Sequence, residues 1–148
     1  MISRTAEYAL RAVVHLADCV NSDEANSSQT LEQIAAGTQV PSGYLSKVLQ
    51  QLAKAGIVIS QRGLGGGFRL ARLPGEITVY DVVQPVDPIG RIPSCPLKLE
   101  AHANGLCPLH ASLDAAAAHI EAAFRSTTIA QLSLGTEPLC HDFIQTSS

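Results

Sequence analysis

Apolar positions in the first part of the chain recur at helical spacing and predict a helix from about Ser3 to Val20. The positions that carry this repeat are Ala6, Leu10, Val13, Ala17 and Val20. The polar cluster that starts at Asn21 ends the helix, and residues 21–29 are expected to form a polar loop.

Two more helices are expected before the pattern changes. Thr30 and Gln33 have the spacing of a capping box, and Gly37 is expected to end this short helix. Pro41 suits the first turn of the next helix, because its missing N–H would have no partner there, and that helix should reach about Gly56. A short helix, a tight turn and a longer helix are the pattern of a helix-turn-helix.

A β-rich segment follows, with residues 57–59, a glycine-rich tip at residues 63–67 and a further run that ends at Leu70. Glycines allow a sharp turn and close approach to another molecule, and Arg62 and Arg69 flank the tip. A nucleotide-binding loop would need a helix directly after its glycines, whereas a strand is expected here. A helix-turn-helix followed by a glycine-tipped basic hairpin predicts a winged helix.

The charge distribution supports contact with a polyanion. The chain carries a net charge of -3, yet residues 40–75 hold five basic residues and no Asp or Glu. Residues 1–75 hold seven Lys and Arg against five Asp and Glu, whereas residues 76–148 hold three against eight. We therefore expect the first half to bind DNA and the acidic second half to serve another role.

The predicted recognition helix turns its apolar residues towards the core and leaves a polar face without acidic residues. Serine and glutamine can read base edges in a major groove, lysine can neutralise phosphate, and arginine on the wing can enter the minor groove. A merely solvated helix face is the alternative. The expected DNA-binding residues are Ser42, Gly43, Tyr44, Ser46, Lys47, Gln50 and Lys54 on the helix, with Arg62, Gly65, Gly66 and Arg69 on the wing.

Composition limits the class of protein. The chain has 148 residues, of which 46% are hydrophobic and 16% charged, as expected for one globular domain with its own core. No apolar run approaches the ~20 residues of a membrane span, so we expect a cytoplasmic protein. Its four cysteines are then expected to be thiols, metal ligands or redox groups, with Cys19 in the core and Cys140 without a role.

Several stretches of the chain are similar to the winged-helix regulators typified by IscR and NsrR, the Rrf-two family, which respond to iron-sulfur status and nitric oxide. The matching residues are Tyr8 to Arg11, Val40 to Leu52 with Ala55 to Val58, Arg62-Gly63 with Gly66 to Leu70, and Ile77-Thr78 with Asp81 to Val83. The resemblance covers nearly the whole chain. It implies a homodimeric transcription factor, usually a repressor, that binds a palindromic operator in double-stranded DNA and carries a sensory loop after the wing.

A helical stripe after Cys107 provides separate support for a dimer. Its expected contact residues are Leu113, Ala116, Ile120 and Phe124, and the alanines beside them permit close approach of another helix. A helix packed on its own domain is the alternative, but the preceding elements already form a closed unit. The expected fold is mainly α with a small β-hairpin: a winged helix-turn-helix (1–75), a linking helix and sensory loop (76–111), and a dimerisation helix with a C-terminal tail (112–148).

The resemblance directs attention to the cysteines after the wing. Cluster-binding members offer three cysteines with five residues between neighbours, whereas this chain keeps the outer pair, Cys95 and Cys107, and has Ala101 at the centre. His102 and His110 complete a Cys-x6-His-x4-Cys-x2-His pattern, and thiolate with imidazole serves both zinc and Rieske-like 2Fe-2S sites. An iron-sulfur cluster, 2Fe-2S favoured, is expected, with zinc or no metal as alternatives.

The resemblance also adds Glu7, which aligns with a position where some members supply an acidic cluster ligand from the partner's first helix. Each of the five candidate ligands has a simpler interpretation. Glu7, His102 and His110 would then be surface residues, and the cysteines would be reduced thiols or a reversible disulfide.

An enzyme is not expected, because the cysteine-containing loop shows no Ser/His/Asp or paired-carboxylate arrangement beside its reactive groups. The remaining alternative is a regulator without a cluster, controlled by a metabolite, thiol oxidation or a partner protein.

Overall fold

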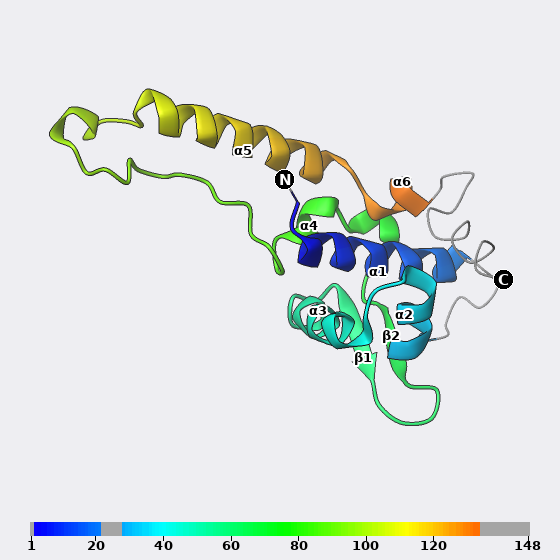
Figure 1. Ribbon diagram of the computed structural model, residues 1–148. Coiled ribbons are helices and arrows are strands. Elements are labelled where there is room, and N and C mark those ends of the chain that lie inside the picture. The colour runs from blue at the N-terminus through cyan, green and yellow to red at the C-terminus, as the bar shows by residue number, and fades with distance from the viewer. Residues whose placement is uncertain (1, 22–27, 134–148) are drawn as a thin grey trace.

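The computed structural model describes residues 2–21 and 28–133. Figure 1 shows a helical body from which a small hairpin extends on one side and a long helix on the other. In chain order the elements are α1 (Arg4–Asn21), α2 (Leu31–Thr38), α3 (Ser42–Lys54), β1 (Val58–Gln61), β2 (Gly67–Leu70), η1 (Pro74–Glu76), α4 (Val79–Val83), η2 (Glu100–His102), α5 (Pro108–Ser126) and α6 (Ile129–Ser133). The predicted class, mainly α with a two-stranded hairpin, is confirmed.

Helix α1 forms the centre of the body, and α2, α3, α4 and α6 all contact it. Its buried face follows the predicted repeat and includes Ala6, Ala9, Val13 and Ala17, each without exposed surface. The predicted core residues of α3 are also confirmed as buried: Leu45, Val48, Leu49 and Leu52. Burial of these apolar side chains provides the main favourable term that holds α3 against α1.

The helix ends match the prediction in part. Thr30 and Gln33 form the expected capping box, with both reciprocal hydrogen bonds present. The prediction that Gly37 ends α2 is wrong, because the helix continues to Thr38 and Gln39 takes the left-handed conformation with φ 56°. Gly37 lies instead against the ring of His15, which a Cβ atom would overlap unless that ring moved.

The recognition helix is one position shorter at its start than predicted. Pro41 is the N-cap residue, and α3 begins at Ser42. Its last helical residue is Lys54, and Gly56 with φ 77° turns the chain into the hairpin. This left-handed turn is favourable for glycine, which has no Cβ to oppose it.

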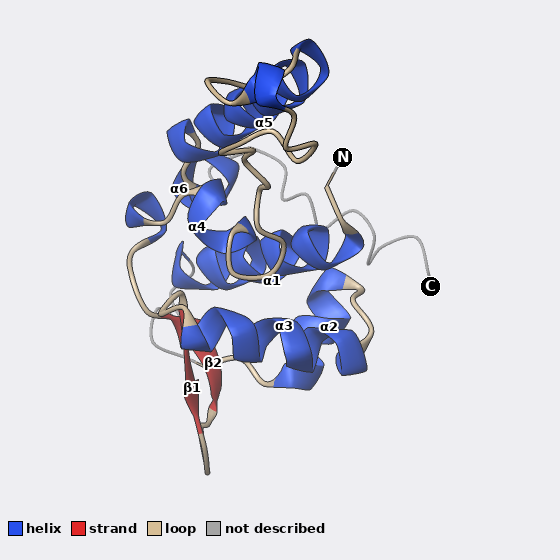
Figure 2. Ribbon diagram, turned by 90° about the vertical axis from the view of Figure 1, so that its left-hand side faces the viewer, coloured by secondary structure: helices blue, strands red, loops and turns tan. Residues whose placement is uncertain are grey.

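The wing is an antiparallel hairpin in which Val58 pairs with Leu70 and Gln61 with Gly67. Figure 2 shows the two strands projecting from the helical body, on the side opposite α5. Gly67 has φ 141°, and a Cβ there would collide with the backbone of Gln29, which pairs with Phe68 in an isolated bridge. The bridge places one end of the predicted polar loop beside the wing; residues 22–27 of that loop lie outside the described part.

Beyond the wing, Thr78 and Asp81 form a second capping box at the start of α4. Thr78 also pairs with Thr128, and this bridge returns the chain to the body after α5. Helix α6 follows, and its first residue, Ile129, is fully buried in the core. The prediction of a dimerisation helix followed only by a tail therefore missed α6; Cys140, in that tail, lies outside the described residues.

Helix α5 differs from the other long helices, because none of its residues is buried. It contacts α4 near its C-terminal end and extends away from the body towards its N-terminal end, as Figure 1 shows. Among the described residues no helix is sufficiently long and apolar to span a membrane.

Candidate nucleic-acid interface and cysteine loop

The predicted DNA-contacting residues of α3 lie outside the buried face that Leu45, Val48, Leu49 and Leu52 form. We call this surface the recognition face; it comprises Ser42, Gly43, Tyr44, Ser46, Lys47, Gln50 and Lys54. All of these residues are exposed except Ser46, which is half-buried and therefore less accessible than predicted. Tyr44 has 62% of its surface exposed, and its ring lies 6.2 Å from that of Tyr8 on α1, so α1 supports its orientation.

The wing places Arg62 directly after β1 and Arg69 on β2, and both are exposed. Gly65 is exposed with φ 73°, and Gly66 is half-buried because its backbone lies against that of Gln61. The sequence reasoning did not single out Leu64, which stands fully exposed between the glycines of the tip. Its exposure follows from its position in the tip and not from any pattern in the chain.

No described acidic side chain neutralises the positive charge of the recognition face and the wing. None of Lys47, Lys54, Arg62 and Arg69 forms an ion pair with another described residue, although Arg72 approaches Asp81 to 3.9 Å. The absence of Asp and Glu from residues 40–75 means that α3 and the wing carry only positive charge. A surface of this kind attracts phosphate without first breaking an internal ion pair.

The second candidate site is the cysteine loop, residues 91–110, at the outer end of α5. It brings Cys95, His102 and Cys107 together, and their ligand atoms all lie within 4.8 Å of one another. His110 Nδ1 is 2.8 Å from Cys107 Sγ and 3.8 Å from Cys95 Sγ, and His102 Nδ1 is 3.4 Å from Cys95 Sγ. The structure thus brings three of the predicted ligands, Cys95, His102 and Cys107, into one group and places His110 against both of its thiols.

Local structure explains this convergence. Cys107 is the N-cap of α5, Pro108 follows it, and the backbone N–H of His110 donates to Cys107 Sγ at 3.5 Å. His110 lies within the first turn, so its ring returns to the same side as the Cys107 thiol. On the other arm, a turn through Lys98 with φ 50° and the short helix η2 carry His102 back towards Cys95.

Both cysteine side chains are buried, with 8% of each residue exposed. The pKa of the Cys95 thiol is lowered, chiefly by a backbone hydrogen bond at Leu97 and also by hydrogen bonds from Cys107, against the opposing effect of burial. A lowered pKa favours the thiolate, which is the form that binds metals and reacts with oxidants.

An ion-pair network that the sequence reasoning missed anchors the loop. Arg91 donates to both carboxylate oxygens of Asp114, at 2.8 and 3.0 Å, and reaches Glu121 at 3.4 Å. The backbone N–H of Ile92 also donates to Asp114, whose pKa falls to about 2, first through the Arg91 hydrogen bonds and then through Ile92. Arg91 and Asp114 are 23 positions apart, so no local spacing rule could have paired them.

The connection continues towards the body of the protein. Glu121 also accepts from Arg125 at 3.0 Å, and the Arg125 guanidinium lies 3.7 Å from the centre of the Tyr80 ring on α4. A chain of contacts therefore links the base of the cysteine loop to α4 along α5, through Arg91, Glu121, Arg125 and Tyr80.

Glu7 is not part of the cysteine loop within one protomer. It lies on the first turn of α1, exposed, in an ion pair with Arg11. Figure 1 shows the start of α1 well separated from the outer end of α5. Within the chain, the structure brings together four of the five predicted metal ligands and leaves Glu7 apart.

The predicted dimerisation residues form two groups along α5. Leu113 and Ala116 are exposed, whereas Ile120 and Phe124 are half-buried and border a groove of about 470 Å³ between α5 and the segment after α4. The other lining residues of the groove are mainly apolar and include Ile2, Val83, Ile89 and Ala117. An apolar stripe that continues from a groove onto an exposed helix is typical of an interaction surface.

A helix-turn-helix with a basic wing defines this molecule as a winged-helix DNA-binding protein. The family Rrf2, described as Iron-dependent Transcriptional regulator, matches residues 2–134. The chain belongs to the Rrf2 family of DNA-binding transcriptional regulators, and it is not an enzyme.

Individual relatives agree with this assignment. The chain is 33% identical over 135 residues to a protein of Aquifex aeolicus (strain VF5) named as an HTH-type transcriptional regulator, covering 89% of this chain and 90% of that protein. It is 31% identical over 103 residues to the HTH-type transcriptional regulator NsrR of Geobacillus kaustophilus (strain HTA426), covering 70% and 65%.

Solved structures share the fold. The global cysteine regulator CymR of B. subtilis superposes with a TM-score of 0.71 at 24% identity, covering 93% of this chain and 98% of that one. IscR of T. potens gives a TM-score of 0.70 at 24% identity, covering 89% and 85%. The arrangement of helices, wing and extended α5 is therefore one that solved structures also contain.

Proposed function

We propose that this protein is a homodimeric repressor whose affinity for a palindromic operator is controlled through the cysteine loop. The recognition face would enter the major groove and the wing the adjacent minor groove. The observation that carries the DNA-binding role is the run from α3 to the wing, where exposed cations have no acidic neighbour in the sequence and no described ion-pair partner. Serine and glutamine beside these cations would read base edges.

The dimer is supported by the exposure of α5. A helix of 19 residues with no buried side chain, an exposed Leu113 and an apolar groove at its base would leave much apolar surface in water if the chain were alone. A second copy covers this surface by two-fold pairing of α5. The same symmetry would place two recognition helices in successive major grooves, roughly 34 Å apart.

The signal would enter at Cys95 and Cys107, since Cys107 caps the helix that carries the proposed dimer surface and Cys95 lies close to it. A change there reaches α5 through the helix cap and reaches α4 through the Arg91–Glu121–Arg125 connection. Redox state, nitric oxide and iron-sulfur status are the signals that act on such thiolates.

Two occupants of the loop are chemically reasonable. A 2Fe-2S cluster would supply redox and nitric-oxide sensitivity, and Cys95 and Cys107 would hold it with a histidine or with Glu7 of the partner subunit. Ala101 offers no donor, so the three-thiolate arrangement does not fit. The second candidate, a zinc-binding or cluster-free regulator, is favoured by the two imidazoles that contact the thiols.

Anaerobic purification followed by a visible absorption spectrum, quantification of iron, sulfide and zinc, and size-exclusion chromatography tests the proposal. DNA binding is then measured before and after treatment with nitric oxide or peroxide. We expect a dimer that binds duplex DNA and whose affinity changes on treatment. Cys95→Ala should keep DNA binding and lose the response, whereas Cys19→Ala, a matched thiol substitution on α1, should keep both. A monomer that fails to bind DNA would overturn the proposal.

A further inference from the structure

We infer that Cys95, His102, Cys107 and His110 form a complete site for a single tetrahedral zinc ion, with all four ligands from one protomer. The inference deepens the proposed function and rests on it, because it names the group that the sensory loop would hold. It differs from a cluster that takes its last ligand from the partner subunit. Glu7 has no place in it.

The distances between the donor atoms carry the argument. A tetrahedral ion with Zn–S bonds of about 2.3 Å and Zn–N bonds of about 2.0 Å sets its sulfur and nitrogen ligands about 3.5 Å apart. Cys95 Sγ lies 3.4 Å from His102 Nδ1 and 3.8 Å from His110 Nδ1. These two edges match the tetrahedron. The 2.8 Å separation of Cys107 Sγ from His110 Nδ1 must lengthen when an ion enters, and His110, which is not among the three donors within 4.8 Å of one another, must move towards His102.

A binuclear cluster requires a different arrangement. In a Rieske-like site the two thiolates bind one iron and the two imidazoles bind the other, so bridging sulfides separate the cysteines from the histidines. Here each imidazole instead contacts a thiol, and His110 contacts both. The donors converge as they would around one ion rather than in two separated pairs.

The donor chemistry and its surroundings also favour zinc. Two thiolates with two imidazoles form a closed structural zinc set, and tetrahedral sulfur–nitrogen geometry is typical of this ion. Cys95 and Cys107 are buried and His102 and His110 are half-buried, which limits the access of water to the centre. Ala101, at the position that could have supplied a third thiolate, is exposed and has no donor atom, so it adds no ligand to these four.

Zinc in this position would join the two arms of the loop. Cys107 and His110 belong to the first turn of α5 or cap it, whereas Cys95 and His102 belong to the arm that arrives from α4. Binding would therefore fix the loop against the N-terminus of the proposed dimer helix, and release would free it.

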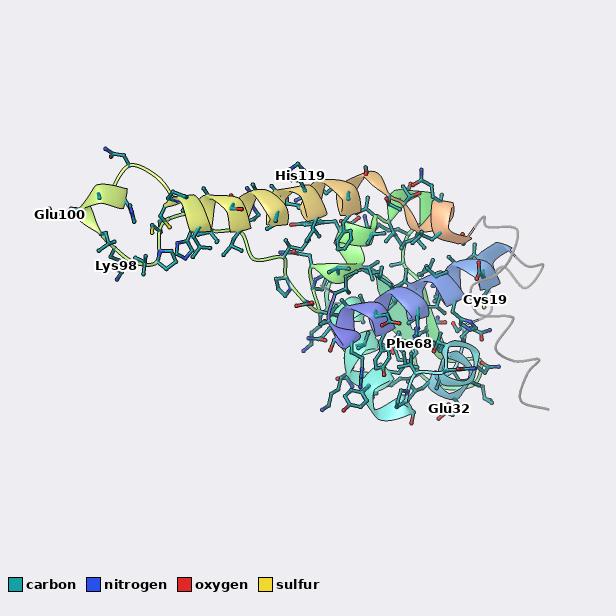
Figure 3. All side chains as sticks on the ribbon, turned by 45° about the horizontal axis from the view of Figure 1, so that its top comes forward. Cys19, Glu32, Phe68, Lys98, Glu100 and His119 are labelled. Carbon is teal, nitrogen blue, oxygen red and sulfur yellow. The ribbon has the colours of Figure 1, made fainter. Side chains whose placement is uncertain are left out.

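Cobalt(II) titration of the reduced, metal-free, full-length protein under anaerobic conditions tests the site, because tetrahedral cobalt absorbs strongly in the visible range and reports thiolate ligation. We expect one cobalt per chain, a tetrahedral spectrum with a thiolate-to-metal band, and displacement by zinc. His102→Ala and His110→Ala should each bind cobalt more weakly and shift its visible bands, because water then replaces an imidazole. His119→Ala, which removes an exposed histidine further along α5 (Figure 3), serves as the matched control and should leave the affinity and the bands unchanged.

The spectrum of the unsubstituted protein decides the question even if a variant fails to fold. Absence of a tetrahedral cobalt spectrum would overturn the inference. The inference would also be overturned if the anaerobically purified protein contained iron with matching sulfide and the Glu7→Gln variant contained neither. DNA binding is measured on the same samples; tetrahedral cobalt in a protein that never binds duplex DNA would refute the proposed function and leave the zinc site standing.

Discussion

Replacing Lys47 by Gln tests whether the recognition face touches phosphate. Lys47 is exposed on α3, no acidic residue lies in residues 40–75, and no described residue forms an ion pair with it. Its charge is therefore available to neutralise a DNA phosphate and release a counterion. Removing that charge should weaken binding and also reduce the dependence of binding on salt.

The size of the effect follows from the dimer. Each phosphate contact to B-DNA contributes about 0.9 to the slope of log affinity against log salt, and a dimer carries two copies of Lys47. The variant should therefore have a slope smaller by about 1.8. Between about 50 and 200 mM salt, the unsubstituted protein should lose about 12-fold more affinity than the variant.

Fluorescence anisotropy with a labelled DNA duplex over this range of salt measures both slopes. Lys98→Gln is the matched control, because it removes the same charge from the cysteine loop at the far end of the molecule (Figure 3). Its slope should equal that of the unsubstituted protein. Equal slopes for Lys47→Gln and the unsubstituted protein would refute the contact. An equal reduction of the slope in both variants would show only a general effect of net charge.

Three further predictions concern stability. Thr30→Ala removes the capping hydroxyl of α2 and should lower the free energy of unfolding in urea by about 1 kcal/mol; no change would contradict the role of the cap. Gly37→Ala should lower the melting temperature despite alanine's higher helix propensity, because its Cβ would overlap the His15 ring, and a higher melting temperature would show that the ring can move. The pKa of Asp114 is lowered from 3.8 to about 2, so its ionised form stabilises the fold above pH 3.8. This contribution disappears as the pH falls towards 2, so the loss of stability in an acid titration should be smaller in Asp114→Asn. An equal loss in the variant would exclude Asp114 as its source.

Local patterns in the chain were sufficient for most of the fold. The repeat of apolar residues located α1 and the core face of α3, and the spacing of Thr30 and Gln33 located the start of α2. These features depend on neighbours three or four positions apart, so the backbone geometry of a helix determines them directly. The absence of acidic residues from residues 40–75 indicated a DNA-binding surface in the same way, because charge is a property of the residues themselves.

Where the local reasoning went wrong, a contact between distant residues was responsible. Gly37 looked like a helix stop, yet it lies against the His15 ring on α1, while Gln39 takes the left-handed position. Helix α6 was missed because five residues carry too short a pattern, and burial of Ile129 against the core is what stabilises it there.

For the cysteine loop, the sequence by itself determined the donor types and the loss of the central cysteine at Ala101. Only the tertiary structure decided that both histidines lie against the thiols and that Glu7 lies elsewhere in the protomer. It also revealed the pairing of Arg91 with Asp114 that holds the loop on α5. The physical reason is that spacing along a chain fixes geometry within a helix, whereas the convergence of donors in an irregular loop depends on turns and long-range contacts that spacing does not encode.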